Sequence, residues 1–175
     1  MEVKFTVPGN PKGKQRPRMS RIRGQNVIYT PKQTIEYEKL VRARCVAALA
    51  KSHPEFDACL GNSDMRNYNG RKYARGASPP AVSKIFFDKD TPLEISIIAL
   101  FSTPKSVGKK LKNSMLIGDI LPTKKPDSDN IIKIILDGLN GVAYWDDSQV
   151  CKVYFEKIYA EKPETRVLIK NYEVC

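Results

Sequence analysis

The sequence has few of the residues that build zinc sites and disulfide frameworks. It contains four cysteines and a single histidine, His53, and no two cysteines form a Cys-x-x-Cys pair. A structural zinc ion normally needs four clustered cysteine or histidine ligands, so we expect no zinc. A disulfide framework is equally unexpected in a cytoplasmic chain of this size. We expect reduced cysteines, with Cys45 and Cys151 in a core and Cys175 at a loose end.

Long apolar runs are also missing. No stretch approaches the roughly 18 consecutive apolar residues of a membrane-spanning helix. The first residues, Met1-Glu2-Val3-Lys4-Phe5, lack the basic-then-apolar layout of a secretory signal. We therefore expect a cytoplasmic protein without a membrane partner.

Negative charge is scarce, particularly near the N-terminus. The chain has 30 Lys and Arg against 19 Asp and Glu, a net charge of +11, and residues 1–44 hold eleven basic residues against three acidic ones. A concentrated positive surface attracts a polyanion. The alternative is a solvated, solubilising face. Nucleic acid is the favoured partner, since the basic residues do not fall on an amphipathic membrane helix.

Hydropathy and turn patterns predict an α+β fold. The 175 residues suit a single domain, residues 1–175, with a mixed β-sheet and two main helices packed on it. Thr30 is expected to cap the first long helix, with Pro31 at its first position. Ser106 is expected to cap a short basic helix. We expect strands at 3–7, 27–29, 93–101, 150–159 and 166–172, and helices at 31–51, 105–115 and 130–139.

Two segments do not fit this regular pattern. Residues 10–18 are expected to form a loop because they contain two prolines and a glycine, and a basic one because they contain two lysines and two arginines. Residues 52–90 are rich in Gly, Asn, Pro, Arg and Ser and only weakly periodic. They predict a long, partly mobile insertion with a short helical turn near Phe56–Leu60.

The segment from Lys124 to Val150 carries most of the chemical information. One face of its predicted helix is apolar (Ile131, Ile132, Ile135, Leu136 and Leu139), and polar residues lie opposite (Asn130, Lys133, Asp137 and Asn140). Acidic residues gather at the two ends of this helix: Asp127 and Asp129 before it, Asp146 and Asp147 after it. If the following strand lies beside the Asp127 segment, these carboxylates converge. Their mutual repulsion would then be relieved by a divalent cation, and magnesium prefers such oxygen ligands.

Such a cluster in a basic protein suits phosphodiester hydrolysis. Magnesium held by aspartates activates water and neutralises the charge of the transition state. Lys133, one helical turn after Asp129, could contact the scissile phosphate or balance the carboxylates. Simpler interpretations exist for each residue alone: Asp129 as an N-cap, Asp146 and Asp147 as turn residues, and Lys133 with Asp137 as a surface ion pair. Trp145 beside the second acidic pair is expected to be buried.

The same segment resembles the signature of the RusA-type Holliday junction resolvases, which are often encoded by phages or prophages. The resemblance rests on D-x-D-N-x-x-K-x-x-x-D-x-L-x-G from Asp127, followed by Trp145-Asp146-Asp147-Ser148-Gln149-Val150. It is close over Lys125–Val150 and looser over 11–18, 27–32 and the final strands. The insertion at 52–90 and Pro126 depart from shorter members of the family.

The resemblance implies a homodimeric, magnesium-dependent endonuclease, in which manganese can substitute, that resolves four-way DNA junctions by paired nicks. It implies a bacterial or phage-infected host. It further implies that Asp127, Asp129 and Asp147 are metal-binding catalytic carboxylates, that Lys133 is the functional lysine, and that Asp146 ranks below Asp147 as a further ligand. A dimer also suits the approximate two-fold symmetry of a junction.

Basic residues that precede the acidic segment, in the N-terminal arm and directly before Asp127, are expected to hold DNA phosphates. These are Lys12, Lys14, Arg16, Arg18, Arg21, Arg23, Lys124 and Lys125. Two alternatives remain open: a non-catalytic basic DNA-binding protein, and a nuclease selective for flaps or other DNA structures.

Overall fold

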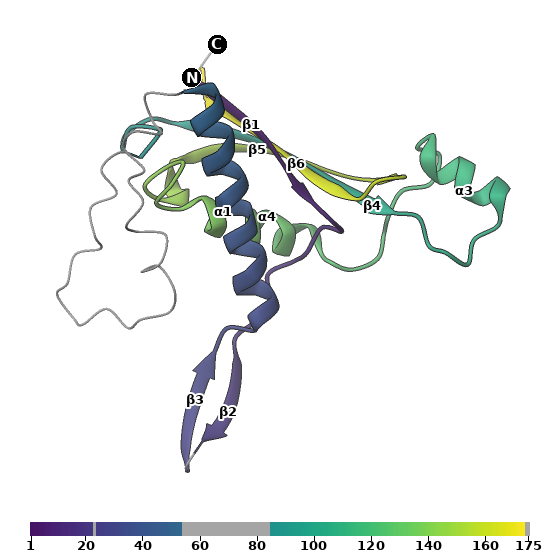
Figure 1. Ribbon diagram of the computed structural model, residues 1–175, viewed down its shortest axis with the longest axis horizontal. Coiled ribbons are helices and arrows are strands. Elements are labelled where there is room, and N and C mark those ends of the chain that lie inside the picture. The colour runs from purple at the N-terminus through teal and green to yellow at the C-terminus, as the bar shows by residue number, and fades with distance from the viewer. Residues whose placement is uncertain (23, 54–84, 174–175) are drawn as a thin grey trace.

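A computed structural model of the chain describes residues 1–22, 24–53 and 85–173 (Figure 1). Arg23, Cys59, Cys175, the predicted turn near Phe56–Leu60 and most of the predicted insertion lie outside the described residues. The described elements follow in chain order: β1 (Glu2–Pro8), β2 (Arg18–Ile22), β3 (Gln25–Tyr29), α1 (Lys32–Ser52), β4 (Leu93–Ser102), α3 (Lys109–Leu116), α4 (Ser128–Leu139), the short 3-10 helix η1 (Asp147–Gln149), β5 (Val150–Ala160) and β6 (Glu164–Asn171).

Four strands form a mixed sheet in the order β1-β6-β4-β5. β4 and β5 run parallel, and the other two neighbouring pairs run antiparallel. β4 lies inside the sheet, which explains its alternating burial and the additional burial of Leu100 on the second face. The α+β prediction is confirmed, with five of the six strands close to their predicted positions.

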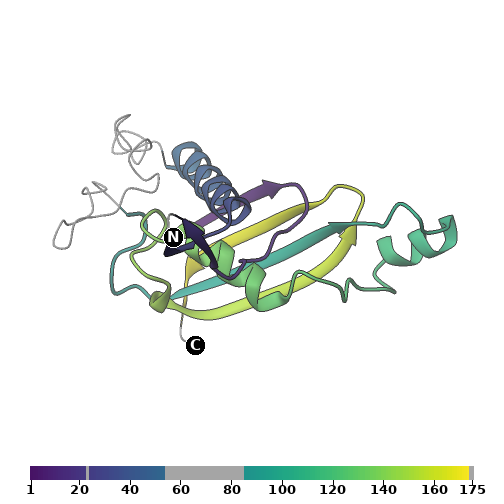
Figure 2. The same ribbon diagram turned by 90° about the horizontal axis from the view of Figure 1, so that it is seen from below.

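The two longer helices, α1 and α4, pack against one another and cover one face of the sheet (Figures 1 and 2). Their buried side chains form one core with the inward residues of the strands. Helical spacing in the sequence predicts a buried face of α1 made of Tyr37, Leu40, Val41, Cys45, Ala48 and Leu49. Of these, Tyr37, Val41, Cys45 and Leu49 are buried, and Leu40 and Ala48 are partly buried against the core. In the described part of the chain, no helix has the length and apolar character to cross a membrane.

The contact between α1 and α4 depends on a glycine. A Cβ atom at Gly138 would lie 3.0 Å from the Cβ of Val41 and 3.2 Å from the carbonyl oxygen of Glu38. The absence of a side chain therefore lets the two backbones approach closely. Because α4 is covered by α1 as well as the sheet, Ile134 and Gly138 are buried, whereas the sequence predicted a single face that omitted both.

Helix starts were predicted less accurately than helix bodies. α1 begins at Lys32 with Pro31 in the N-cap position and no side-chain cap, so the predicted capping by Thr30 is wrong. α3 begins after Gly108, not after Ser106. Short polar side chains are also common in loops, so their presence does not fix a helix start.

Two further predictions are corrected by the structure, and one strand was missed. Cys151 is exposed because it lies on the edge strand β5. Trp145 precedes this edge and is 54% exposed rather than buried. β2 was not predicted as a strand because its residues, Arg-Met-Ser-Arg-Ile, show no marked apolar alternation. Its pairing with β3 gives it the strand conformation.

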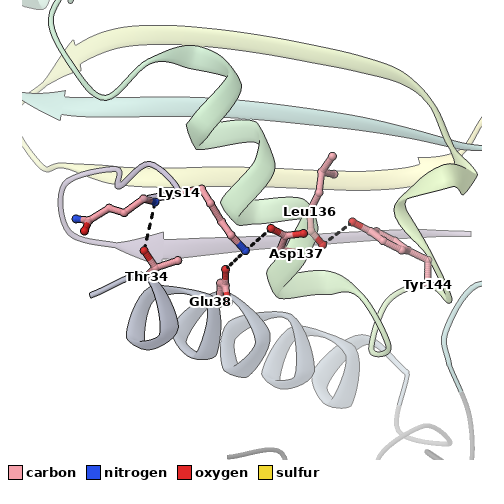
Figure 3. A network of polar contacts seen from close by, with 7 residues as sticks. Lys14, Thr34, Glu38, Leu136, Asp137 and Tyr144 are labelled. Atoms are coloured by element: carbon pink, nitrogen blue, oxygen red, sulfur yellow. Dashed lines mark hydrogen bonds and ion pairs between the residues drawn. The ribbon is translucent and has the colours of Figure 1, made fainter. Parts of the chain in front are cut away.

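One lysine ties the N-terminal loop to both long helices. The Nζ atom of Lys14 donates to Glu38 Oε1 on α1 at 2.6 Å and to Asp137 Oδ2 on α4 at 2.5 Å (Figure 3). The backbone N–H of Lys14 also donates to the carbonyl of Asn130 at 2.8 Å. Burial alone would lower the pKa of Lys14, but the hydrogen bonds and charges of Asp137 and Glu38 outweigh it and raise the pKa. This raised pKa marks a stabilising interaction of the charged ammonium.

Replacing Lys14 by Met should lower the free energy of unfolding by about 1–3 kcal/mol, because two neighbouring carboxylates then lose their shared cation. Urea unfolding measures this. Lys4→Met is the matched control: the Lys4–Glu2 pair is largely exposed, so its loss should cost less than about 1 kcal/mol. Adding Asp137→Asn to Lys14→Met should recover part of the loss. Equal effects of Lys14→Met and Lys4→Met would contradict the assignment.

The pH dependence has a defined sign. Since the folded-state pKa of Lys14 is raised, its contribution should be complete below its ordinary value of 10.5 and decline only as the pH rises through the higher folded value.

Candidate functional site

The first two predicted acids lie at the start of α4. Asp127 occupies the N-cap position, but its side chain accepts no capping hydrogen bond. Asp129 lies in the first turn of the helix, so it is not the N-cap. Both residues are exposed. Two carboxylates thus stand near each other at the helix start, and neither is used for capping.

An open hollow of about 480 Å³ lies beside Asp127. Three segments surround it: the N-terminal loop, the first turn of α1 and the start of α4. Its lining residues are Pro11, Lys12, Gly13, Lys14, Gln15, Gln33, Thr34, Lys125, Pro126, Asp127 and Asn130. The structure therefore brings two predicted phosphate-binding lysines, Lys12 and Lys125, together with a predicted catalytic aspartate.

Gly13 allows the loop to lie flat against the start of α4. A Cβ atom at this position would lie 2.8 Å from the Cβ of Pro126 and 3.1 Å from the Cβ of Asn130. Any side chain would displace the loop or the helix start. The shape of the hollow thus depends on this glycine.

Lys157 on β5 holds the segment that precedes α4. Its Nζ donates to the carbonyl oxygens of Lys124 at 2.8 Å and Pro126 at 3.0 Å. It also lies 5.3 Å from the ring centroid of Phe101. Sequence reasoning missed this residue. The available signal was a lysine within a partly buried strand, where its ammonium needs acceptors.

The second acidic pair lies in a well-connected turn before β5. Asp146 accepts a hydrogen bond from the backbone N–H of Ser148 at 3.0 Å and forms a capping box with Gln149. The hydrogen bonds from Ser148 lower the pKa of Asp146. Gln149 also donates to the carbonyl oxygens of Asp88 at 2.8 Å and Thr91 at 3.2 Å. Asp146 therefore caps η1, while Asp147 remains exposed.

The two acidic pairs lie at opposite ends of β5. Lys157, which holds the Asp127 segment, is seven residues after Val150, which follows the turn of Asp147. Seven residues of strand span about 23 Å. At the other end, Asp147 lies near Tyr144: burial raises the pKa of this tyrosine, and the charge of Asp147 adds to the effect. The Tyr144 hydroxyl donates to the carbonyl of Leu136, near the end of α4 (Figure 3).

Within one chain, the predicted convergence of Asp127, Asp129 and Asp147 does not occur. Among residues 1–22, 24–53 and 85–173, no three Asp, Glu, His or Cys side chains lie close enough together to hold a metal ion. The physical reason is direction: α4 begins near the end of β5 and finishes near its start. One chain therefore offers two separate carboxylate groups.

Some of the remaining predicted residues are exposed, and others are held in ion pairs. Lys133 is exposed on α4, and Asp137 pairs with Lys14, whereas the alternative interpretation paired it with Lys133. Lys14 lines the hollow but is held by two carboxylates, and its contact with a DNA phosphate stays a prediction. Among the other residues predicted to hold phosphates, those that are exposed are Lys12, Arg16, Arg18, Arg21, Lys124 and Lys125.

Comparison with known proteins agrees with the resemblance of the central motif. The family model described as endodeoxyribonuclease RusA matches residues 60–170, more than half of the chain. The chain is also similar to a Bacillus subtilis (strain 168) protein described as "Uncharacterized protein YqaN". The two are 29% identical over 171 residues, which cover 97% of this chain and 96% of that protein. The chain belongs to the RusA endodeoxyribonuclease family.

Proposed function

We propose that this protein is a homodimeric, magnesium-dependent endonuclease that resolves four-way DNA junctions by paired nicks. The observation that carries the proposal is the pair of exposed carboxylates at the start of α4, not used for capping, beside a hollow lined by lysines. Membership of a family of endodeoxyribonucleases supports DNA as the substrate.

The donor set at the start of α4 fits magnesium. This ion is usually bound by one or two protein carboxylates, retained waters and the phosphates of the substrate. Asp127 and Asp129 would hold it, and Lys12 and Lys125 would bring the phosphate into the hollow. When bound, magnesium supplies an activated water and neutralises developing charge; manganese offers the same chemistry with oxygen ligands.

Protein groups at the helix start have complementary tasks. The N-terminus of α4 carries a partial positive charge that favours a phosphate in the hollow. Lys133, one turn further along, would stabilise negative charge on the phosphate oxygens in the transition state. Lys157 is a positioning residue, since it holds the carbonyl groups that precede Asp127.

A second protomer can supply the missing carboxylate. β5 pairs with β4 on one side only, and residues 151–154 on this edge strand are exposed, including Val153 at 39% and Tyr154 at 51%. An exposed edge with apolar side chains is suited to pairing with another chain. In a two-fold antiparallel pairing, the start of one β5 lies beside the end of the other. Asp147 of one protomer would then approach Asp127 of its partner.

The direct test is cutting of a synthetic four-way junction by the purified protein. With magnesium or manganese we expect two symmetric nicks, and with EDTA we expect an intact, bound junction. A flap and a linear duplex, assayed in parallel, should be cut much more slowly. Binding without cutting at any magnesium or manganese concentration would favour the non-catalytic alternative, and faster cutting of flaps would favour the structure-selective one.

Mixed dimers test whether the site is shared. Homodimers of Asp127→Asn and of Asp147→Asn should bind the junction but cut it at least about 100-fold more slowly. A heterodimer of the two variants, purified through two different tags, should regain one complete site and nick one strand without paired resolution. Sites contained within one protomer would leave this heterodimer inactive.

A reciprocal heterodimer is the matched control. Wild-type chain paired with the Asp127→Asn/Asp147→Asn double variant damages both shared sites and should be inactive. Sites contained within one protomer would instead leave one intact and permit nicking. The two heterodimers must therefore give opposite results.

Phosphate binding in the hollow predicts a change in salt dependence. Lys12→Ala and Lys125→Ala should each weaken DNA binding, and each should reduce the slope of log K against log salt by about one, because one counterion-releasing contact is lost. Fluorescence anisotropy at several salt concentrations measures the slope. Lys170→Ala removes an equal charge on β6, where Lys170 lies near Glu94, and should leave the slope unchanged.

A further inference from the structure

The β2–β3 hairpin projects away from the body of the protein, beyond the start of α1 (Figure 1). Its two strands form a separate antiparallel sheet. All residues of β3 are exposed. A lone two-stranded hairpin is at best marginally stable in water. Its exposed apolar side chains do not pack into a core, so their presence needs another explanation.

Both faces of this hairpin carry exposed apolar side chains. Met19 and Ile28 are cross-strand partners on one face, and they are 67% and 73% exposed. Val27 and Tyr29 lie on the other face of β3, at 39% and 44%. Exposed apolar groups gathered on one projecting element indicate a binding surface.

The charge of the hairpin identifies the class of partner. Arg18 and Arg21 lie on β2, Arg16 lies at its root, and all three are exposed. Residues 3–35 contain no Asp or Glu. A dimer contact through this hairpin would place its arginines against a second chain of net charge +11, which disfavours the hairpin as the place where two copies meet. Apolar and arginine side chains on a two-stranded ribbon instead suit a DNA groove.

The root of the hairpin adjoins the hollow beside Asp127. The backbone N–H of Gln15 donates to Thr34 Oγ1 at 3.3 Å, and the Gln15 side chain donates to Gln33 Oε1 at 3.0 Å. All three residues also line the hollow. A five-residue strand reaches about 17 Å, or about five base-pair steps. DNA with a phosphate in the hollow would therefore lie within reach of Met19 and Ile28.

We propose that the β2–β3 hairpin selects branched DNA by inserting Met19 and Ile28 at the branch point. This inference rests on the proposed junction-cutting function. Inserting an apolar wedge into linear duplex requires unstacking of bases, which opposes binding. At the branch point of an open junction the base stack is interrupted, so the same insertion meets less resistance. The arginines bind phosphates of either DNA, and the apolar pair supplies the discrimination.

The test compares Met19→Ser/Ile28→Ser with wild-type protein in EDTA, where binding is separated from cutting. Binding to a four-way junction should weaken about tenfold or more, and binding to a duplex of the same sequence should change less than about twofold. The salt slope should stay the same, because no charge is removed. Fluorescence of 2-aminopurine beside the branch point should rise with wild-type protein and not with the variant.

Two variants control for general effects of the substitution. Ile117→Ser/Leu121→Ser removes a similar apolar pair, 74% and 53% exposed, that lies outside the hairpin, and should leave both affinities unchanged. Met19→Leu/Ile28→Leu keeps the apolar character and should retain selectivity for junctions. An unchanged thermal unfolding midpoint in all variants would exclude global unfolding.

Several outcomes would overturn the inference. The first is that the Met19→Ser/Ile28→Ser variant binds junction and duplex equally more weakly, and the second is that its affinity for neither changes. The third is that light scattering shows the variant to have lost its dimer, which would make the hairpin a subunit contact. Cutting assays separate this inference from the proposed function. If the Met19→Ser/Ile28→Ser variant loses selectivity for junctions but the wild-type protein does not cut, only the nuclease proposal is refuted. If the wild-type protein cuts and the variant keeps its selectivity, only the wedge proposal is refuted.

Discussion

α4 and β5 run in opposite directions, and this arrangement separates the two pairs of acidic residues within one chain. α4 begins where Lys157 of β5 holds the Pro126 carbonyl, and it ends near Tyr144 and the turn that leads into β5. Carboxylates at the two ends of this short segment of sequence are therefore kept apart by the length of the helix, about 18 Å for its 12 residues. If two protomers paired antiparallel through β5, the start of one β5 would lie beside the end of the other. Asp147 of one protomer would then lie near Asp127 of its partner.

The loop that carries the basic residues is positioned by a small number of strong contacts. Lys14 is neutralised by carboxylates from α1 and α4, and Gly13 lets the backbone contact the start of α4. This arrangement uses one basic residue for structure and leaves its neighbours, Lys12 and Arg16, exposed. Net charge alone does not show which basic residues of the loop have a structural role and which remain exposed. The structural role of Lys14 depends on carboxylates from two distant helices, which the sequence of the loop does not show.

Periodic apolar patterns made the fold predictable, and the relative placement of distant segments limited the prediction of the site. The spacing of Tyr37, Val41, Cys45 and Leu49 identified the buried face of α1 because packing follows helical geometry. The motif from Asp127 identified the family. Neither signal contains the direction in which α4 crosses the sheet. Lys157 was missed for a related reason. A lysine in a partly buried strand indicates that acceptors are needed, but the sequence does not show that they are backbone carbonyls about thirty residues away.

A shared site would give the proposed enzyme a safeguard that follows from its electrostatics. A monomer with charge +11 can bind any DNA through counterion release, and a complete site on each monomer would expose that DNA to unpaired nicks. Dividing the carboxylates between protomers makes cutting depend on dimerisation, whereas binding needs only the basic surface. Two-fold symmetry then creates both sites at once. Paired cutting would thus arise from assembly itself, without a separate signal between the two sites.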